Sequence, residues 1–267
     1  MSYLQSIILG AVQGLTEFLP VSSSGHLAIF KQLLIPQQQI PVLFDILLHI
    51  ATLIAVLLVF HKRILKIIIS LGKLIGKKTD DEDRANLRLL ITILIATAAT
   101  VIIALALEKI EGMVENNTKI ISLLFIITGI ILIVAHFFRA DKTYHTLNPL
   151  QGIITGIAQG LGIFPGISRS GITISAALAC GIKRDKAGEF SFLISIPAII
   201  GALIIKIKDA PQLLEEVALP LVSVGAVTAF IVGFFALLLL LRIIKKGRLY
   251  LFSFYLIPLG IISFFLV

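Results

Sequence analysis

Hydrophobic residues dominate eight stretches of the chain, and shorter polar segments separate them. Six of these stretches run for about 20 residues, enough for a helix to cross the hydrocarbon core of a bilayer. They are residues 41–60, 87–107, 119–138, 187–207, 217–241 and 249–267. The runs have the length of helices and lack the alternating pattern of about 10 residues that marks a membrane β-strand. The pattern therefore predicts an all-α integral membrane protein with six transmembrane helices.

The other two hydrophobic stretches, residues 3–34 and 150–181, are interrupted near their middle. The first is broken at Leu-Pro-Val-Ser-Ser-Ser-Gly and the second at Phe-Pro-Gly-Ile-Ser-Arg-Ser-Gly. Each half is only about 10–14 residues long, which is too short to span a bilayer. Irregular backbone at membrane depth is tolerated where protein buries it or where it lines a wet cavity. We therefore expect two re-entrant helical hairpins.

The two breaks carry copies of one motif. QGLTEFLPVSSSG (residues 13–25) and QGLGIFPGISRSG (residues 159–171) lie 146 positions apart, and seven of their thirteen residues are identical. Such an internal repeat predicts two similar halves, approximately 1–140 and 141–267 of a single membrane domain. Broken helices at corresponding positions of two halves point to a binding site where the halves meet.

The orientation of the halves follows from the number of helices in each. One hairpin and three spanning helices per half predict an inverted-topology repeat, because three is odd. Loops rich in Lys and Arg stay in the cytoplasm, which places both termini outside. The first hairpin then enters from outside and the second from inside, so that their tips meet near the midplane. The basic loops are 61–88, 139–149, 182–186 and 242–248, with 17 of the 23 Lys and Arg residues.

The composition supports this membrane interpretation. The chain is 58% hydrophobic and 14% charged, whereas soluble domains are about 25% charged. The net charge of +8 lies largely in short loops between hydrophobic stretches, so it indicates topology and no nucleic-acid partner. The longest loop, 61–88, has KKTDDEDR at its centre, which we expect to be a solvated run of charges. The single cysteine, Cys180, is expected to pack in a helix.

A short helix is expected to begin after each break, and its first turn is a candidate anion site. Ser22 or Ser23 and Ser168 are well placed as N-caps. A helix N-terminus offers unpaired N–H groups and partial positive charge, and the Arg169 side chain can bind phosphate oxygens in pairs. Two such ends suit a phosphate or diphosphate. The alternative is that the serines only cap helices and Arg169 pairs with a carboxylate.

Glu17 is the most informative acidic residue, because burying a carboxylate within the membrane costs free energy unless the group is paired, binds a metal ion or titrates. It lies one helical turn after Gln13. It can pair with Arg169, bind a metal ion or transfer a proton, and the sequence does not separate these roles.

Ser23 and His26 are three residues apart and are expected to share one face of the second short helix. A histidine beside a serine suggests a base and its nucleophile, or a histidine nucleophile with hydroxyls that hold the phosphate. The alternative is a histidine that only packs between helices. The predicted catalytic residues are Glu17, Ser23, His26 and Arg169.

Further polar side chains lie within reach of the breaks. Thr173 follows Arg169 by one turn, and Asp45 and His49 are one turn apart at the start of the first spanning segment. Asp45 and His49 either extend the polar cavity or serve as an interfacial acid and a packing histidine. The predicted substrate-binding residues are Gln13, Ser22, Ser24, Asp45, Ser168, Ser170 and Thr173.

These motifs resemble the undecaprenyl-diphosphate phosphatase family, which is linked to bacitracin resistance. QGLTEFLPVSSSGH (13–26) is similar to the first signature of that family, and PGISRSGITIS (165–175) is similar to the second. FDILLHIATL around Asp45 and EFSFLISIPAIIGA (189–202) also resemble family segments, so the similarity covers essentially the whole chain. The family's functional residues fall on Glu17, Ser23, His26, Ser168, Arg169 and Thr173.

The resemblance implies hydrolysis of a C55 prenyl diphosphate to the monophosphate, which recycles the carrier lipid for cell-wall synthesis. It implies a multi-pass protein of the bacterial inner membrane, and a homodimer is a further expectation. Because the first break enters from outside and holds Glu17, Ser23 and His26, we expect the site to open to the extracytoplasmic side. Many family members have a second Glu where this chain has Gln13. We therefore expect Mg²⁺ or Ca²⁺, if it takes part, to be bound by Glu17, alone or with Asp45.

Three nucleophiles remain open: Ser23 activated by His26, His26 itself, or a water molecule activated by Glu17. A different class is also open, because transporters and flippases of lipid phosphates are built on inverted repeats with broken helices. The cluster of Glu, Ser and His favours the hydrolase, since transport needs no nucleophile.

Overall fold

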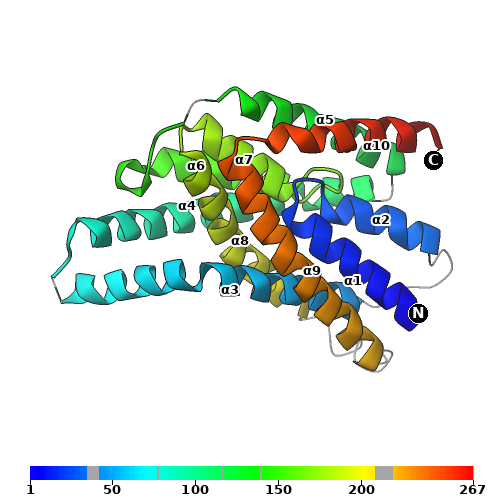
Figure 1. The fold of residues 1–267 in the computed structure, drawn as a ribbon, viewed down its shortest axis with the longest axis horizontal. Helices are drawn as coiled ribbons and strands as arrows, with labels where there is room; N and C mark the ends of the chain where they lie inside the picture. The colour runs from blue at the N-terminus through cyan, green and yellow to red at the C-terminus, as the bar shows by residue number, and fades with distance from the viewer. Residues whose placement is uncertain (35–41, 77, 116, 139, 208–218, 267) are drawn as a thin grey trace.

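The computed structural model describes residues 1–34, 42–76, 78–115, 117–138, 140–207 and 219–266. These residues form an all-helical bundle, and no β-strand occurs among them (Figure 1). Parts of the predicted segments 41–60, 217–241 and 249–267 fall outside the described residues, namely positions 41, 217, 218 and 267.

The first half begins with a hairpin of two short helices, α1 (Tyr3–Phe18) and α2 (Ser23–Leu34). Three longer helices follow: α3 (Val42–Ile75), α4 (Asp81–Glu115) and α5 (Thr118–His136). The prediction that the first hydrophobic stretch is broken is confirmed, since α1 ends just before Pro20 and α2 begins just after the positive-φ residue Ser22.

The second half has the same order of helices. A 3₁₀ turn (Tyr144–Thr146) precedes the short pair α6 (Pro149–Leu161) and α7 (Arg169–Ala179). The longer helices are α8 (Arg184–Ile207), α9 (Leu219–Lys245) and α10 (Ser253–Leu266), the last preceded by a 3₁₀ turn at Leu249–Phe252. Six helical segments of the described chain are long and apolar enough to cross a membrane, as predicted.

The prediction of a long polar loop over residues 61–88 is wrong. Helix α3 continues to Ile75 and α4 already begins at Asp81, so only a short turn separates them. The two helices have 34 and 35 residues, or about 50 Å each at 1.5 Å per residue. They run as a pair beyond the other helices at one end of the molecule (Figure 1).

The charge run in this region is also only partly solvated. Asp83 is buried, and its carboxylate accepts hydrogen bonds from Ser70 Oγ at 2.8 Å and Lys73 Nζ at 2.9 Å. These bonds hold the start of α4 against α3. The apolar residues between the lysines of α3 recur at helical spacing. For this reason the helix continues into the segment that was predicted to be a loop.

Each short hairpin packs mainly against a long helix of the other half. Helix α1 lies on α9 and α6 lies on α4, while α5 packs along α10. Glycines permit the close approach: a Cβ on Gly10 would collide with the Gly225 backbone, and one on Gly156 would collide with the Ala96 backbone. Such contacts between small residues are typical of helix pairs in membranes. The hairpins are therefore fixed by helices that are distant in sequence.

Replacing Gly156 by valine is expected to destabilise the protein by about 1–3 kcal/mol or more, because the new side chain has no room between α6 and α4. Gly72→Val is the control, since a Cβ at Gly72 on α3 meets nothing within 4 Å. The measurement is the fraction of protein that stays monodisperse in detergent after heating. Equal heat resistance of the two variants would contradict the packing described here.

Candidate active site

The two breaks meet in the interior, and Ser22 joins them. Ser22 has the left-handed backbone angle φ +69°, which is uncommon for a residue other than glycine. Its hydroxyl accepts one hydrogen bond from the Gly25 N–H at 3.4 Å and one from the Gly166 N–H at 2.9 Å. The first bond caps α2, as predicted for Ser22. The second ties the first break to the second.

The second break is held in a similar way by Ser168 and α5. Ser168 is the N-cap of α7, and its hydroxyl accepts from the Gly171 N–H at 3.1 Å, which confirms the predicted cap. Thr128 on α5 donates to the Gly166 carbonyl at 2.9 Å and accepts from the Ser168 N–H at 3.2 Å. Both helix N-termini are therefore fixed at one place in the bundle.

The Glu17 carboxylate is the centre of the polar cluster. Arg169 Nη2 donates to Glu17 Oε1, so the two residues form an ion pair between the hairpins. Ser23 Oγ donates to Glu17 Oε2 at 2.7 Å, and Gln13 Nε2 donates to the same oxygen at 3.0 Å. The side chain of Glu17 is 4% exposed and that of Arg169 is 24% exposed. The pairing with Arg169, one of the roles that the sequence left open, is thus present.

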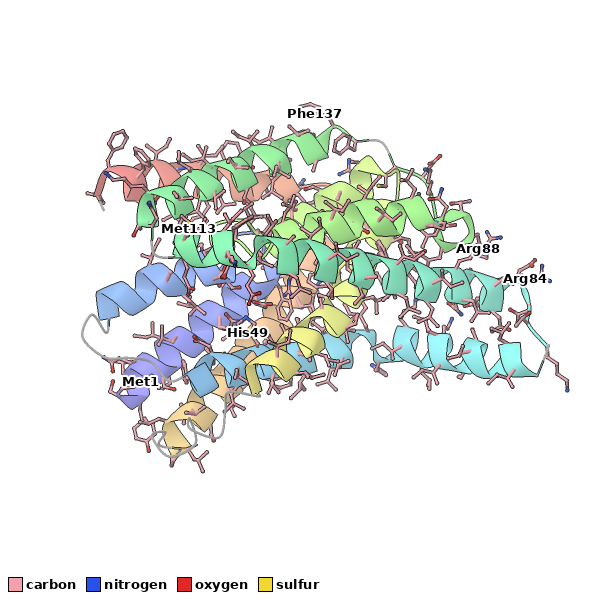
Figure 2. All side chains as sticks on the ribbon, turned by 180° about the vertical axis from the view of Figure 1, so that it is seen from behind. Met1, His49, Arg84, Arg88, Met113 and Phe137 are labelled. Carbon is pink, nitrogen blue, oxygen red and sulfur yellow. The ribbon has the colours of Figure 1, made fainter. Side chains whose placement is uncertain are left out.

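His49 on α3 completes this cluster. Its Nε2 lies 3.9 Å from Glu17 Oε2, and its Nδ1 is 2.8 Å from the Asp45 carbonyl oxygen. Figure 2 shows His49 amid the helices. The spacing of Asp45 and His49 suggested a common role, but the histidine is the residue that borders the cavity described below, and Asp45 lies outside its wall. The predicted substrate contact of Asp45 remains a prediction.

His26 has partners other than Ser23. Its Nδ1 is 2.8 Å from the Ser22 carbonyl oxygen, and its Nε2 is 2.7 Å from the Tyr255 hydroxyl. A carbonyl only accepts, so Nδ1 carries a proton, and in the neutral ring Nε2 accepts from Tyr255. The ring is buried, stacks on Tyr255 and meets the edge of Phe125. Both ring nitrogens are therefore engaged by residues other than Ser23. Tyr255 had no signal in the sequence, because it lies 229 residues from His26.

Tyr255→Phe is expected to lower kcat for phosphate release less than tenfold, because it keeps the ring stack and removes only the hydrogen bond to His26. Tyr250→Phe, in the 3₁₀ turn before α10, is the matched control and should leave kcat unchanged. Steady-state kinetics of both variants make the comparison. A loss of several hundredfold in Tyr255→Phe would show that His26 takes part in the chemistry.

Ser170 and Thr173 stabilise the second break from positions outside the cavity wall. Ser170 Oγ is 3.2 Å from Ser168 Oγ. The Thr173 hydroxyl is 2.8 Å from the Arg169 carbonyl oxygen and 2.5 Å from Ser191 Oγ on α8. Both residues are buried outside the wall of the cavity. Their predicted contact with substrate remains a prediction, and in this structure they hold α7 in place.

A cavity of about 360 Å³ opens at the meeting point of the breaks. Its polar end contains the Glu17 and Arg169 side chains, and its apolar end is lined by α4 and α8, including Leu105 and Ile205. Leu105 is 60% exposed, so this end reaches the apolar outer surface of the bundle. The polar wall also includes Ser22, Ser23, Ser24, His49, Gln159 and Ser168. The cavity suits an amphiphile with an anionic head and a hydrocarbon tail.

Comparison with known proteins agrees with this chemistry. The sequence matches the family model described as bacitracin resistance protein BacA over residues 6–262. The chain belongs to this family. It is 51% identical over 262 residues to the undecaprenyl-diphosphatase of Treponema denticola, which covers 98% of this chain and 96% of the relative. The undecaprenyl-diphosphatases of Borrelia hermsii and Korarchaeum cryptofilum are each 38% identical, over 265 and 263 residues, with 98% of each chain covered.

Membership in the BacA family and the six apolar helices identify a multi-pass membrane protein. The family resemblance expected from the two motifs is thereby confirmed. Both signature segments lie within the matched residues and supply the Glu17, Ser23 and Arg169 side chains of the cavity.

The possible metal ligands are few. Within the described ranges, no three His, Cys, Asp or Glu side chains gather as they do in a protein-built metal site. Glu17 is the carboxylate among the described residues of the cavity wall. Mg²⁺ is commonly held by one or two carboxylates together with substrate phosphates. Glu17 therefore fits a cation that is also bound by the phosphates of a diphosphate.

Proposed function

We propose that the protein is a membrane-embedded hydrolase that converts undecaprenyl diphosphate to undecaprenyl phosphate and inorganic phosphate, and so recycles the lipid carrier of cell-wall synthesis. The observation that carries this proposal is the contact of Ser23 and Arg169 with the same buried carboxylate, Glu17, at the polar end of a cavity whose other end is apolar. A transporter needs no hydroxyl bonded to a carboxylate, so this contact favours hydrolysis. The names of the relatives agree with it.

The chemistry begins when the diphosphate enters between the two helix N-termini. Arg169 exchanges its contact with Glu17 for the phosphate oxygens and neutralises the charge that spreads over them. Glu17, released from the arginine, accepts the proton of Ser23. The Ser23 oxygen bonds to the terminal phosphorus, and the bond from that phosphorus to the bridging oxygen breaks, so undecaprenyl phosphate leaves. A water molecule then attacks the phosphoserine, which restores Ser23 and releases inorganic phosphate.

His26 has a positioning role in this scheme. Its bond to the Ser22 carbonyl fixes the turn from which Ser23 projects. The structure therefore supports Ser23 activated by Glu17 over the predicted pair of Ser23 and His26. The apolar arm between α4 and α8 is where the first isoprene units of the tail would lie, with the rest in the bilayer.

The inverted repeat, the two re-entrant hairpins and the extracytoplasmic opening of the site are part of the same proposal. The exchange of packing partners between halves, α1 with α9 and α6 with α4, supports a two-fold related arrangement. The distribution of Lys and Arg supports a cytoplasmic turn between α3 and α4. Labelling of single cysteines at Lys62 and Lys109 tests the orientation. If the cysteine at position 109 were labelled only from the cytoplasm, the orientation would be the opposite of the one proposed.

Residence in the bacterial inner membrane and a homodimer remain predictions. Fractionation of bacterial membranes tests the first. The molar mass of the protein in lipid nanodiscs tests the second, and a single copy per disc at high protein concentration would exclude the dimer.

Chelation of divalent cations with EDTA is expected to lower phosphate release about tenfold or more, and added Mg²⁺ or Ca²⁺ should restore it. A bound cation would neutralise phosphate charge, and Glu17 is the residue that would join it. The measurement is initial rate against free metal concentration. Full activity in EDTA would contradict the predicted requirement for a cation.

The proposed function is tested by phosphate release from undecaprenyl diphosphate with purified protein in detergent or liposomes. We expect turnover with the C55 substrate and little with isopentenyl diphosphate, whose single five-carbon unit fills only a small part of the arm between α4 and α8. Absence of phosphate release by folded protein, with either cation supplied, would refute the proposal.

A further inference from the structure

Gln159, on α6, has an amide whose orientation is fixed by two neighbours. Its Nε2 donates to Thr100 Oγ1 on α4 at 3.1 Å and to the Ile194 carbonyl oxygen on α8 at 3.2 Å. Because a carbonyl cannot donate a hydrogen bond, the nitrogen of the amide must face Ile194. The Thr100 hydroxyl is itself held by the Ala96 and Gly156 carbonyls, at 2.8 and 3.0 Å. These contacts identify which atom of the amide is the nitrogen, and so assign Oε1 as the acceptor that remains.

That oxygen is a buried acceptor without a partner. Gln159 is 2% exposed, and its Oε1 has no hydrogen bond in the structure. Buried polar groups are nearly always satisfied by protein or by ordered water, so such an atom requires an explanation. Gln159 borders the same cavity as Glu17, Ser23 and Arg169. The explanation must therefore be sought in what this cavity binds.

The chemistry of the oxygen restricts its partner. An amide oxygen only accepts, so it cannot bind the ionised oxygens of a phosphate, which also only accept. Hydrolysis consumes one water molecule, and water has two protons to donate. One proton is taken by the base during attack, and the other is available to a fixed acceptor beside the cavity.

We propose that Gln159 Oε1 is the positioning acceptor for the hydrolytic water. The inference rests on the proposed function. The water oxygen forms a bond to the terminal phosphorus while the bond from Ser23 to that phosphorus breaks. Glu17 returns the proton that it took from Ser23 to the serine oxygen and accepts one water proton in its place, which it then releases to solvent. The other water proton donates to Gln159 during the approach and stays on the new phosphate hydroxyl. A water held at both protons is aligned for attack and loses less entropy in the transition state.

Selection of water over alcohols follows from this geometry. Methanol has a single hydroxyl proton, which the base takes, so methanol cannot also donate to Gln159. The wild type should then transfer phosphate to water in strong preference to added methanol. Removal of the Gln159 acceptor should slow phosphate transfer to water and leave transfer to methanol unchanged, so the preference for water should fall.

The test is the ratio of methyl phosphate to inorganic phosphate produced from undecaprenyl diphosphate in buffer that contains methanol. For Gln159→Leu we expect kcat for hydrolysis to fall about 10- to 100-fold, KM to stay within about twofold, and the ratio to rise about tenfold. The ratio reports the competition for phosphorus whichever step limits turnover. Gln151→Leu is the matched control, because Gln151 is also buried on α6 but donates to the Cys180 carbonyl, outside the cavity.

Gln159→Glu covers the case in which the leucine variant does not fold. Its introduced carboxylic acid can donate to Ile194 and still present an oxygen to water, so hydrolysis should persist at low pH and fall as this acid ionises. An unchanged product ratio in Gln159→Leu, an equal change in Gln151→Leu, or a loss confined to KM would overturn the inference. If the wild type released no phosphate, the proposed function would fail and the inference with it. An active wild type with an unchanged ratio in Gln159→Leu refutes the inference alone.

Discussion

Replacement of Arg169 by alanine is expected to lower kcat/KM for phosphate release by about 10³-fold or more. The guanidinium lies in the cavity wall and is a partner of Glu17. Its removal takes away the group that neutralises the transferring phosphoryl and leaves a buried carboxylate that repels the substrate. Arg169→Lys should recover only part of the activity, because an ammonium group cannot bind two phosphate oxygens in the fixed geometry of a guanidinium.

Arg63→Ala is the matched control for this variant. Arg63 also pairs with a glutamate, Glu189 on α8, and is partly buried. It lies outside the cavity wall, so its loss is expected to affect stability more than turnover. Initial rates over a range of substrate concentrations separate the two effects. If Arg63→Ala and Arg169→Ala lost equal activity while both remained folded, the special role of Arg169 would be contradicted.

Ser23→Ala is expected to lower kcat by about 10³- to 10⁴-fold, the second large effect. The Ser23 hydroxyl donates to Glu17 Oε2 at 2.7 Å and borders the cavity, so it is placed to lose a proton and attack. Binding should change little, because Arg169 and the helix N-termini remain. The loss is therefore expected in kcat, with KM within a few fold of the wild type.

Ser24→Ala provides the control within the same run of serines. Ser24 also borders the cavity, but its hydroxyl is near Ser22 Oγ, at 3.5 Å. We expect a decrease of less than about tenfold in kcat for Ser24→Ala. Turnover by Ser23→Ala at a rate near that of the wild type would assign the attack to water or to His26.

Most of the helical architecture was predictable because it is encoded locally. The hydrophobic runs gave the six long helices, and the paired Gly, Pro and Ser positions gave the two breaks with caps at Ser22 and Ser168. The repeat also placed Glu17 and Arg169 at corresponding breaks, 152 residues apart, and so predicted that they would meet. The prediction of a loop over residues 61–88 failed because the polar run KKTDDEDR obscured the helical spacing of the apolar residues before and after it.

The finer geometry of the site depends on contacts that local patterns do not encode. Tyr255 lies near the other end of the chain from His26, and its hydroxyl engages the ring nitrogen Nε2 that could otherwise have served Ser23. Thr173 follows the same principle, since its contact with Ser191 on α8 explains its place behind the site. The unpaired oxygen of Gln159 emerges only when α4, α6 and α8 are brought together.

The most direct test of the central claim is a rapid quench in SDS at neutral pH, which preserves both phosphoserine and phosphohistidine, of the protein with undecaprenyl diphosphate labelled at the terminal phosphate, followed by peptide mass spectrometry. The geometry of Glu17, Ser23 and Arg169 predicts label on the peptide that contains Ser23 in the wild type and none in Ser23→Ala. Label on His26, or normal turnover of Ser23→Ala without any labelled peptide, would contradict a serine nucleophile at the meeting point of the two breaks.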